Sequence, residues 1–265
     1  MSLLAEYSPK RYLKLVLPLA ALGVVTYYAI KACQFELGEL ISSLVHNSEV
    51  YLRFVDLDLS SLGRMIEAAG ITVLLAALAT PIGAALSVVF ALAAAKNVST
   101  KWMRLLSRLS LGLERSLPDI VVLFIFIAAF GVGVFPAVIA LAIGSLGMLG
   151  KLWADAIEEV DEKSIDSMRA SGASLWQSIR YGVIPQIMPA IVSNSIFRFE
   201  VNVRAATVLG GLSGVGIGYE LNRAFVLLEY GRMGMAIVVI VVVVHVCERL
   251  SGFARNRILV KGGLE

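Results

Sequence analysis

Residues 71–95 carry no charged side chain, and this one stretch restricts the fold more than any other part of the sequence. An α-helix needs about 20 mostly apolar residues to cross a bilayer core about 30 Å thick. The whole chain has the same character, because 58% of its 265 residues are hydrophobic and only 16% are charged. Soluble domains carry about 25% charged residues. The sequence therefore predicts an all-α integral membrane protein.

Several further stretches are apolar enough to form membrane helices. Residues 120–150 are also uncharged, but the run is too long for one span, and Gly131-Val-Gly-Val-Phe-Pro136 breaks it into two helices joined by a tight turn. The first apolar run continues to Ile30, which predicts a retained helix rather than a cleaved signal peptide. We expect about six transmembrane helices, near residues 12–30, 64–95, 105–130, 136–156, 186–209 and 233–252.

The distribution of charge predicts the orientation of these helices. Basic residues flank the first and last helices and fill the loop after the second, whereas the segment between the first two helices is mainly acidic. Because Lys and Arg collect on the cytoplasmic side of membrane proteins, we expect both termini to be cytoplasmic. Arg223 and Arg232 then fall on the outer side, against this trend.

The chain divides into three predicted parts. Residues 1–63 hold the first helix and an outer interfacial segment, because positions 31–63 are too polar to span and predict a short amphipathic helix at the membrane surface. Residues 64–252 form the membrane core, which includes a cytoplasmic loop at 157–185. Residues 253–265 form a cytoplasmic tail.

The loop at 157–185 begins with acidic residues and then becomes amphipathic. Ile165, Met168, Gly172 and Leu175 recur at three- and four-residue steps, which places them on one face of a helix. Such a helix either presents this face to a partner protein or belongs to an ordinary solvated loop.

The spacing in this loop resembles the cytoplasmic motif of type I ABC importer membrane subunits. That motif reads Glu-Ala-Ala, three residues, Gly, nine residues, then Ile-x-Leu-Pro. Counted from Gly172, its first three positions are Asp166-Ser167-Met168 and its closing pair is Ile184-Pro185. Met168 and Gly182 depart from the motif.

Other stretches are similar to the phosphonate/phosphite branch of these permeases. One is residues 197–210 together with the glycine-rich residues 214–218. Another is Arg115-Ser-Leu-Pro-Asp119, together with the pattern Thr72, Thr80-Pro81 and Gly83. The resemblance covers residues 64–252.

This resemblance implies a type I ABC importer permease fold in a bacterial plasma membrane, and the import of phosphonate, phosphite or a similar phosphorus oxyanion. The implied partners are a second permease copy in a homodimer, two cytoplasmic ABC ATPase subunits and an extracytoplasmic substrate-binding protein. The ATPases would use ATP and Mg²⁺, and we expect no cofactor, metal or nucleic acid on this chain. The residues implied in ATPase coupling are Asp166, Ser167, Met168, Arg169, Ala170, Gly172 and Ala173.

Charged residues inside the fifth predicted helix need an explanation, because each costs ~2.5–3.5 kcal/mol at the centre of a bilayer. Glu200 and Arg204 have the four-residue spacing of a pair on one helix face. Arg198 shares a face with Asn202, and Asp119 or Glu114 are its candidate partners. These charges either fix the helix register and dimer interface or give positive potential to the path of an oxyanion. The predicted network comprises Arg115, Asp119, Arg198, Glu200, Asn202 and Arg204.

The glycine-rich segment after this helix lacks the Gly-Lys-Ser/Thr of a phosphate-binding loop. We expect it to form a bend or a close-packed gate near the outer mouth, because glycine gives the backbone freedom. The residues concerned are Gly210, Gly211, Gly214, Gly216 and Gly218.

Three alternatives to the oxyanion permease remain open from the sequence. A type I ABC permease for another small solute, such as methionine, fits the cytoplasmic motif equally well but the 198–204 stretch less well. An ATP-independent secondary transporter often shows an internal repeat, and none is convincing here. A membrane enzyme is a distant third, because no catalytic set of residues converges.

Overall fold

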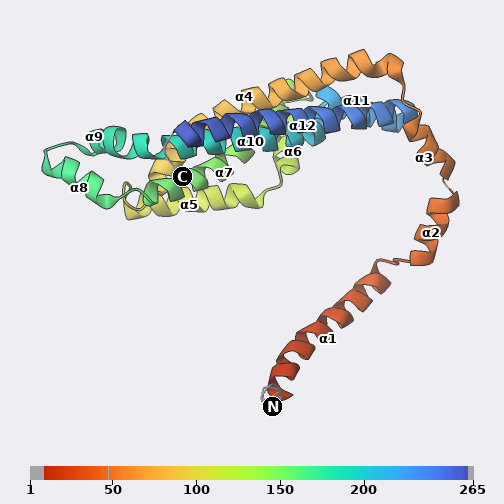
Figure 1. Ribbon diagram of the computed structural model, residues 1–265, viewed down its shortest axis with the longest axis horizontal. Helices are drawn as coiled ribbons and strands as arrows, with labels where there is room; N and C mark the ends of the chain where they lie inside the picture. The colour runs from red at the N-terminus through yellow and green to blue at the C-terminus, as the bar shows by residue number, and fades with distance from the viewer. Residues whose placement is uncertain (1–8, 47, 262–265) are drawn as a thin grey trace. The chain divides into compact units, whose positions relative to one another are not determined.

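The computed structural model describes the backbone of residues 9–46 and 48–261 (Figure 1). All regular elements in these residues are helical, which confirms the predicted all-α class. The described residues form two units, one ending at Arg53 and one beginning at Phe54.

The first unit contains α1 (Pro9–Ala32), α2 (Leu37–His46) and most of α3 (Ser48–Val55). The apolar part of α1, Val16–Ala32, exposes large side chains such as Leu17 and Tyr28, as a lipid-facing helix does. Two short helices, α2 and α3, lie where the sequence predicts a single amphipathic helix. Their predicted position at the membrane surface stays a prediction.

Three helices of the second unit are long and apolar enough to cross a membrane, within the described residues. They are α4 (Leu62–Ala94, preceded by the short helix η1, Leu59–Ser61), α7 (Val134–Glu158) and α12 (Tyr230–Lys261). Helix α10 (Ile184–Ser213) is comparably long but carries charged residues, and α6 (Asp119–Phe130) is apolar but short. The four long helices lie side by side in one bundle (Figure 1).

The helix predicted at 105–130 is wrong as a single element. The structure has two helices there, α5 (Lys101–Ser116) and α6, separated at Leu117-Pro118. Leu117 is extended, with φ −89° and ψ 124°, because the ring of a following proline disfavours the helical conformation. Pro118 then precedes the first turn of α6, where its missing N–H costs nothing.

The predicted cytoplasmic loop at 157–185 is mostly helical. It contains α8 (Glu162–Ala170), α9 (Leu175–Ser178) and a π-helix, η2 (Ile179–Val183), which runs directly into α10. Helices α8 and α9 extend beyond one end of the bundle, next to the end of α7 and the start of α5 (Figure 1). We call this the α8–α9 end.

The core of the second unit depends on close contact between α4 and α7. A Cβ atom added to Gly83 on α4 would lie 2.4 Å from the Cβ of Ser145 and 2.6 Å from the carbonyl oxygen of Ala142, both on α7. Small residues allow helices to pack this closely in a membrane, where dispersion forces and hydrogen bonds replace the hydrophobic effect. A larger residue at position 83 would separate the two helices.

At the opposite end of the bundle, the chain before α4 is fastened to the start of α12. Arg232 Nε donates to Asp58 Oδ2 at 3.1 Å, and the backbone N–H of Asp58 donates to Gly231 O at 3.2 Å. Hydrogen bonds from the Ser60 hydroxyl and then from Arg232 hold the pKa of Asp58 below its ordinary value.

Candidate functional site: a polar network, a bend and a docking loop

A buried polar network joins α10 to α4 and α7. Asn202 is fully buried, and its Nδ2 donates to Thr80 Oγ1 at 2.9 Å and to Ser145 Oγ at 3.0 Å. The Thr80 and Ser145 hydroxyls in turn donate to carbonyl oxygens of their own helices, at 2.7 Å in each case. Because no water is present in the bilayer core to satisfy an amide, this arrangement fixes the rotation of α10 against its neighbours.

Arg198 belongs to the same network and has one end left over. Its Nε donates to Ser145 Oγ at 2.9 Å and its Nη1 approaches Met148 Sδ at 3.6 Å. Its Nη2 is buried and has no hydrogen-bond partner among the described residues. The residue is only 6% exposed, and its unpaired guanidinium nitrogen can donate hydrogen bonds to an anion.

The two carboxylates expected near Arg198 are indeed its neighbours. A Cβ on Gly144 would lie 2.5 Å from Asp119 Oδ1 and 2.9 Å from Arg198 Nη2, so both groups rest against the same α7 glycine. A Cβ on Gly147, one turn along, would overlap Glu114 Oε2 at 1.3 Å. Neither carboxylate forms one of the described ion pairs with Arg198. The two glycines thus leave room for polar side chains to pack against α7. Arg198 lies in the electrostatic field of the Asp119 and Glu114 carboxylates but forms no direct ion pair with either.

The predicted pairing of Glu200 with Arg204 is wrong. Arg204 Nη2 instead lies 2.5 Å from Oε1 of Glu248 on α12. Glu200 is 7% exposed, and its Oε1 has no partner in the part of the chain that is described. A neighbouring helix offers Arg204 a carboxylate that spacing within α10 does not reveal. Glu248 lies inside the predicted last span, so a list of charges in every span would have found it.

The glycine-rich segment forms a sharp bend between α10 and α11 (Gly216–Val226). Gly214 and Gly216 have φ values of +75° and +71°, which disfavour other residues. Helix α11 then turns back along α10 so closely that a Cβ on Gly218 would lie 1.8 Å from Thr207 O. Gly210 and Gly211 face the same contact, with added Cβ atoms 2.5 Å from Val215 O and 3.2 Å from Gly218 O. Movement of this bend as a gate stays a prediction.

The predicted docking residues lie on α8 and in the turn that follows it. Asp166, Ser167 and Ala170 are exposed, and Met168 is partly buried with its sulfur against Gly182 of η2. Gly172 has φ +85° and open space around it, and the N–H of Ala173 donates to Met168 O at 3.0 Å. The side chains of Ile165 and Arg169 lie outside the described part of the structure. The described docking residues therefore form a largely exposed surface on a short helix, α8, and on the tight turn at Gly172 that follows it.

The connection from this segment to α10 is continuous. Helix α9 begins with a capping box, in which Ser174 and Gln177 each bond the other's backbone. It continues into the π-helix η2 and then, without a break, into α10. π-Helical turns are rare and are frequently found at functional sites. One continuous helical path thus runs from α9 through η2 to Arg198 and Asn202 on α10.

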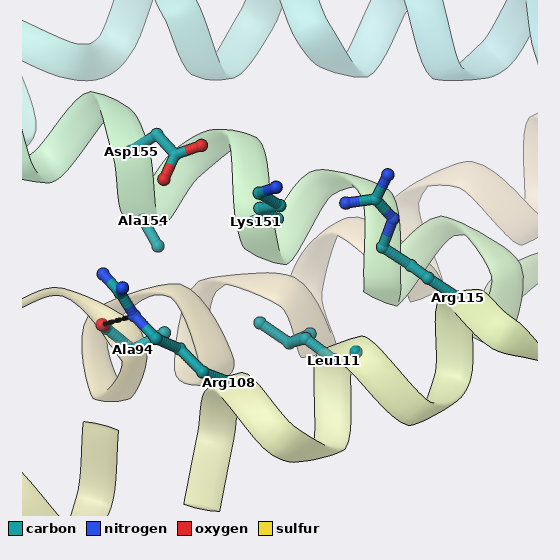
Figure 2. Close-up of a pocket in the computed structure, with 8 residues that line it drawn as sticks. Ala94, Arg108, Leu111, Arg115, Lys151, Ala154 and Asp155 are labelled. Carbon is teal, nitrogen blue, oxygen red and sulfur yellow. Dashed lines mark hydrogen bonds between the residues drawn. The ribbon is translucent and has the colours of Figure 1, made fainter. Parts of the chain in front are cut away.

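Arg115 takes part in none of the described ion pairs, and its part in the charge network with Arg198 stays a prediction. It lines a cavity between α5 and α7 that also includes Arg108, Lys151 and Asp155 (Figure 2). Lys151 and Asp155 were missed at the level of sequence, although both are charges close to the predicted end of the fourth helix. No group of three potential metal ligands occurs among the residues that the structure covers.

Known proteins resemble this chain in both sequence and fold. Residues 83–258 match the family described as "Binding-protein-dependent transport system inner membrane component". The phosphate-import permease protein of Mycolicibacterium smegmatis is 38% identical over 215 residues, which is 79% of this chain and 40% of that protein. A putative phosphite transport system permease protein of Stutzerimonas stutzeri is 32% identical over 251 residues, covering 94% of this chain and 88% of that protein.

Solved structures place the fold in the same group. A methionine ABC transporter in an inward-facing conformation has a TM-score of 0.64 at 17% identity. The match covers 76% of this chain and 99% of the transporter's chain. An amino acid ABC transporter has a TM-score of 0.61 at 21% identity, with the same shares covered. The predicted type I ABC importer permease fold is therefore confirmed.

Proposed function

We propose that this chain, which belongs to the family of binding-protein-dependent transport system inner membrane components, forms the path of a phosphorus oxyanion across a bacterial plasma membrane. As a member of that family it is the multi-pass membrane component of an ABC importer, and ATP is hydrolysed in partner subunits. The family name also implies a substrate-binding protein. Phosphonate, phosphite and similar anions are the substrates we assign.

The observation that carries this assignment is the agreement among relatives. Matching permeases are named for phosphate import, for phosphite transport and, in Escherichia coli K12, for a cryptic phosphonate transport system at 37% identity over 121 residues. Their named substrates are all phosphorus oxyanions. The buried guanidinium of Arg198, with Nη2 unpaired, gives this chain a group suited to such an anion.

In the mechanism we propose, movement of the docking segment at α8–α9 is coupled to movement of the polar network at Arg198 and Asn202. The ATPases would grip α8 and the Gly172 turn, at Asp166, Ser167, Met168, Arg169, Ala170, Gly172 and Ala173. Their closure on ATP and Mg²⁺ would move α9, η2 and α10 together as a rigid body. Because α10 holds Arg198 and Asn202, that movement would change the access of the network to either side of the membrane. The α8–α9 end and both termini would then be cytoplasmic.

A homodimer of permeases is the assembly we propose, with two ATPases and one binding protein. Two different putative phosphite permease proteins of S. stutzeri match this chain, at 32% and 33% identity. A pair of related permeases is therefore the alternative that a purified complex would reveal by mass spectrometry. No partner role for nucleic acid is proposed.

Methionine is the second candidate substrate. Methionine permease proteins also match the sequence, but at 24% and 22% identity over about half of the chain. The oxyanion assignment is favoured because its relatives are closer. An ATP-independent transporter is disfavoured by the family assignment itself.

ATPase activity of the reconstituted complex with its binding protein tests the proposal. The panel should include a phosphonate, phosphite, phosphate and methionine. We expect stimulation by one or more of the phosphorus oxyanions and none by methionine. Stimulation by methionine alone would keep the permease and remove the substrate class, and transport by the purified chain without any ATPase would overturn both.

A further inference from the structure

A cavity of about 300 Å³ lies between α5 and α7, near the α8–α9 end of the bundle. Its position follows from its lining, which includes the last residue of α4, the part of α5 from Arg108 to Arg115 and the last turns of α7. Figure 2 shows Arg108 and Arg115 extending from α5, with Lys151 and Asp155 on the neighbouring α7. The residues that line it are Ala94, Arg108, Leu111, Gly112, Arg115, Lys151, Ala154 and Asp155.

One of the three cationic side chains at this cavity, Arg108, already has hydrogen-bond and ion-pair partners. Arg108 Nε donates to Ala94 O at 3.1 Å, and its Nη2 lies 2.6 Å from Oε1 of Glu158. Arg108 is thereby held as part of the wall, and its charge is balanced. It closes the side of the cavity nearest the α7–α8 junction.

The other two cations, Arg115 and Lys151, have no carboxylate partner among the described ion pairs. Lys151 is one helical turn from Asp155, but the two form no such pair. Both cations therefore keep all their donors for a ligand. With Arg108 balanced by Glu158, the remaining charges on the lining residues are two positive and one negative. The carboxyl group of Glu114 interacts with Arg115 but does not line the cavity. The lining itself therefore has an excess of positive charge, which attracts anions.

The shape and lining favour a compact anion over a large one. The cavity is large enough for roughly ten waters at about 30 Å³ each, so a tetrahedral oxyanion fits with part of its hydration shell. Leu111, Gly112 and Ala154 provide apolar walls, which strengthen the attraction between charges by excluding water. A guanidinium offers a planar pair of donors to a phosphoryl group, and an ammonium adds a point charge.

We propose that Arg115 and Lys151 form a second anion site, which binds the phosphoryl oxyanion group at the α8–α9 end of the permease. The site shares no lining residue with the network of Arg198 and Asn202, and it includes the last turns of α7, which precede the segment that would dock the ATPases. The choice of a phosphoryl ligand rests on the proposed function. The same chemistry is supplied by the transported solute or by the headgroup of an anionic phospholipid, and the experiment separates these sources.

The test uses the complete permease–ATPase complex in nanodiscs of phosphatidylcholine, without binding protein, and radiolabelled inorganic phosphate as the probe. The double variant Arg115→Gln/Lys151→Gln should weaken saturable phosphate binding at least about tenfold. Each substitution removes a charged hydrogen-bond donor, and such donors contribute substantially to the affinity for an anion. Lys151→Arg, which keeps the positive charge, should retain most of the binding that Lys151→Gln loses. Asp155→Asn should strengthen it by removing the competing negative charge.

Arg104→Gln is the matched control, because Arg104 lies on α5, one turn before Arg108, and does not line the cavity. It should bind phosphate as the unmodified complex does. The lipid arm repeats the measurement in phosphatidylglycerol nanodiscs and counts retained lipid by native mass spectrometry. Phosphatidylglycerol that blocks phosphate binding and is lost from the double variant identifies a headgroup occupant; undiminished phosphate binding identifies the solute.

Equal binding of phosphate and of phosphatidylglycerol by the double variant and the unmodified complex overturns the site. That result leaves the proposed function intact if phosphorus oxyanions still stimulate the ATPase. If no phosphorus oxyanion stimulates the unmodified complex, yet phosphate binding depends on Arg115 and Lys151, the substrate assignment fails and the site stands.

Discussion

Asn202 on α10 donates a hydrogen bond of 2.9 Å to Thr80 on α4, between residues 122 positions apart in the sequence. The same amide reaches Ser145 on α7, so one side chain ties three long helices together. Arg198, one turn earlier on α10, bonds to the same serine hydroxyl at 2.9 Å. Any movement of α10 during transport must either carry α4 and α7 with it or break these bonds.

Replacing Asn202 with Ala should therefore destabilise the bundle. The variant loses hydrogen bonds to Thr80 and Ser145, at a cost of ~1 kcal/mol by comparison with other membrane helices. The measurement is the melting temperature of the complex in detergent. Asn222→Ala is the control, because that amide makes a single longer bond of 3.3 Å at an exposed position. Equal melting temperatures for the two variants would contradict the role of Asn202.

The ion pair between Arg204 and Glu248 should behave as a unit in a charge-exchange experiment. Arg204→Glu and Glu248→Arg each place like charges together, and the double exchange restores an opposite pair. Because both side chains are partly exposed in the single chain, the expected coupling is small, about 0.5–1 kcal/mol. Thermal melts of the four proteins give that coupling energy directly.

Glu200→Gln serves as the comparison for this pair. It should show no coupling with Arg204→Gln, because Arg204 pairs with α12 rather than within its own helix. Coupling of Arg204 to Glu200 instead of Glu248 would restore the pairing that the sequence predicts.

Sequence reasoning recovered what depends on local pattern. The uncharged run at 71–95 became α4, and the break at 131–136 became the turn between α6 and α7, with Gly131 at φ +81°. Both outcomes follow from rules that act over a few neighbouring residues. The same holds for the glycine bend at 214–216, where positive φ values require a residue without a side chain.

Apart from the carboxylates expected near Arg198, contacts between helices lay beyond that reasoning. The pairing of Arg204 with Glu248 and the shared use of Ser145 by Arg198 and Asn202 depend on how α10 rotates against its neighbours. Spacing along one helix restricts which residues share a face but not which helix that face meets. The cavity at Arg115 and Lys151 was missed for the same reason, since these two cations come from different helices, α5 and α7.

Replacing Gly218 with Ala should disrupt the contact between α10 and α11. The new methyl group would lie 1.8 Å from Thr207 O, so the backbones must separate, at a cost of roughly 1–3 kcal/mol. Thermal stability and transport should both fall. Gly70→Ala is the control, because no atom lies within 4 Å of the position its Cβ would take. A Gly218→Ala protein as stable as Gly70→Ala would show that α11 does not pack against α10 in this way.

Replacing Gly172 with Trp should prevent productive contact with the ATPases while leaving membrane insertion intact. Gly172 has φ +85°, a conformation that costs other residues about 1–2 kcal/mol, and the indole would also occupy the exposed surface of the α8 turn. The measurements are copurification of the ATPase subunits and substrate-stimulated ATP hydrolysis, with the amount of permease in the membrane as the reference. Gly252→Trp is matched to it, since Gly252 also has open space around it but lies in α12 with an ordinary helical φ. We expect the Gly252 variant to retain its ATPases and the Gly172 variant to lose them or their stimulation. Full coupling in Gly172→Trp would remove the α8 turn from the proposed mechanism and leave the family assignment unchanged.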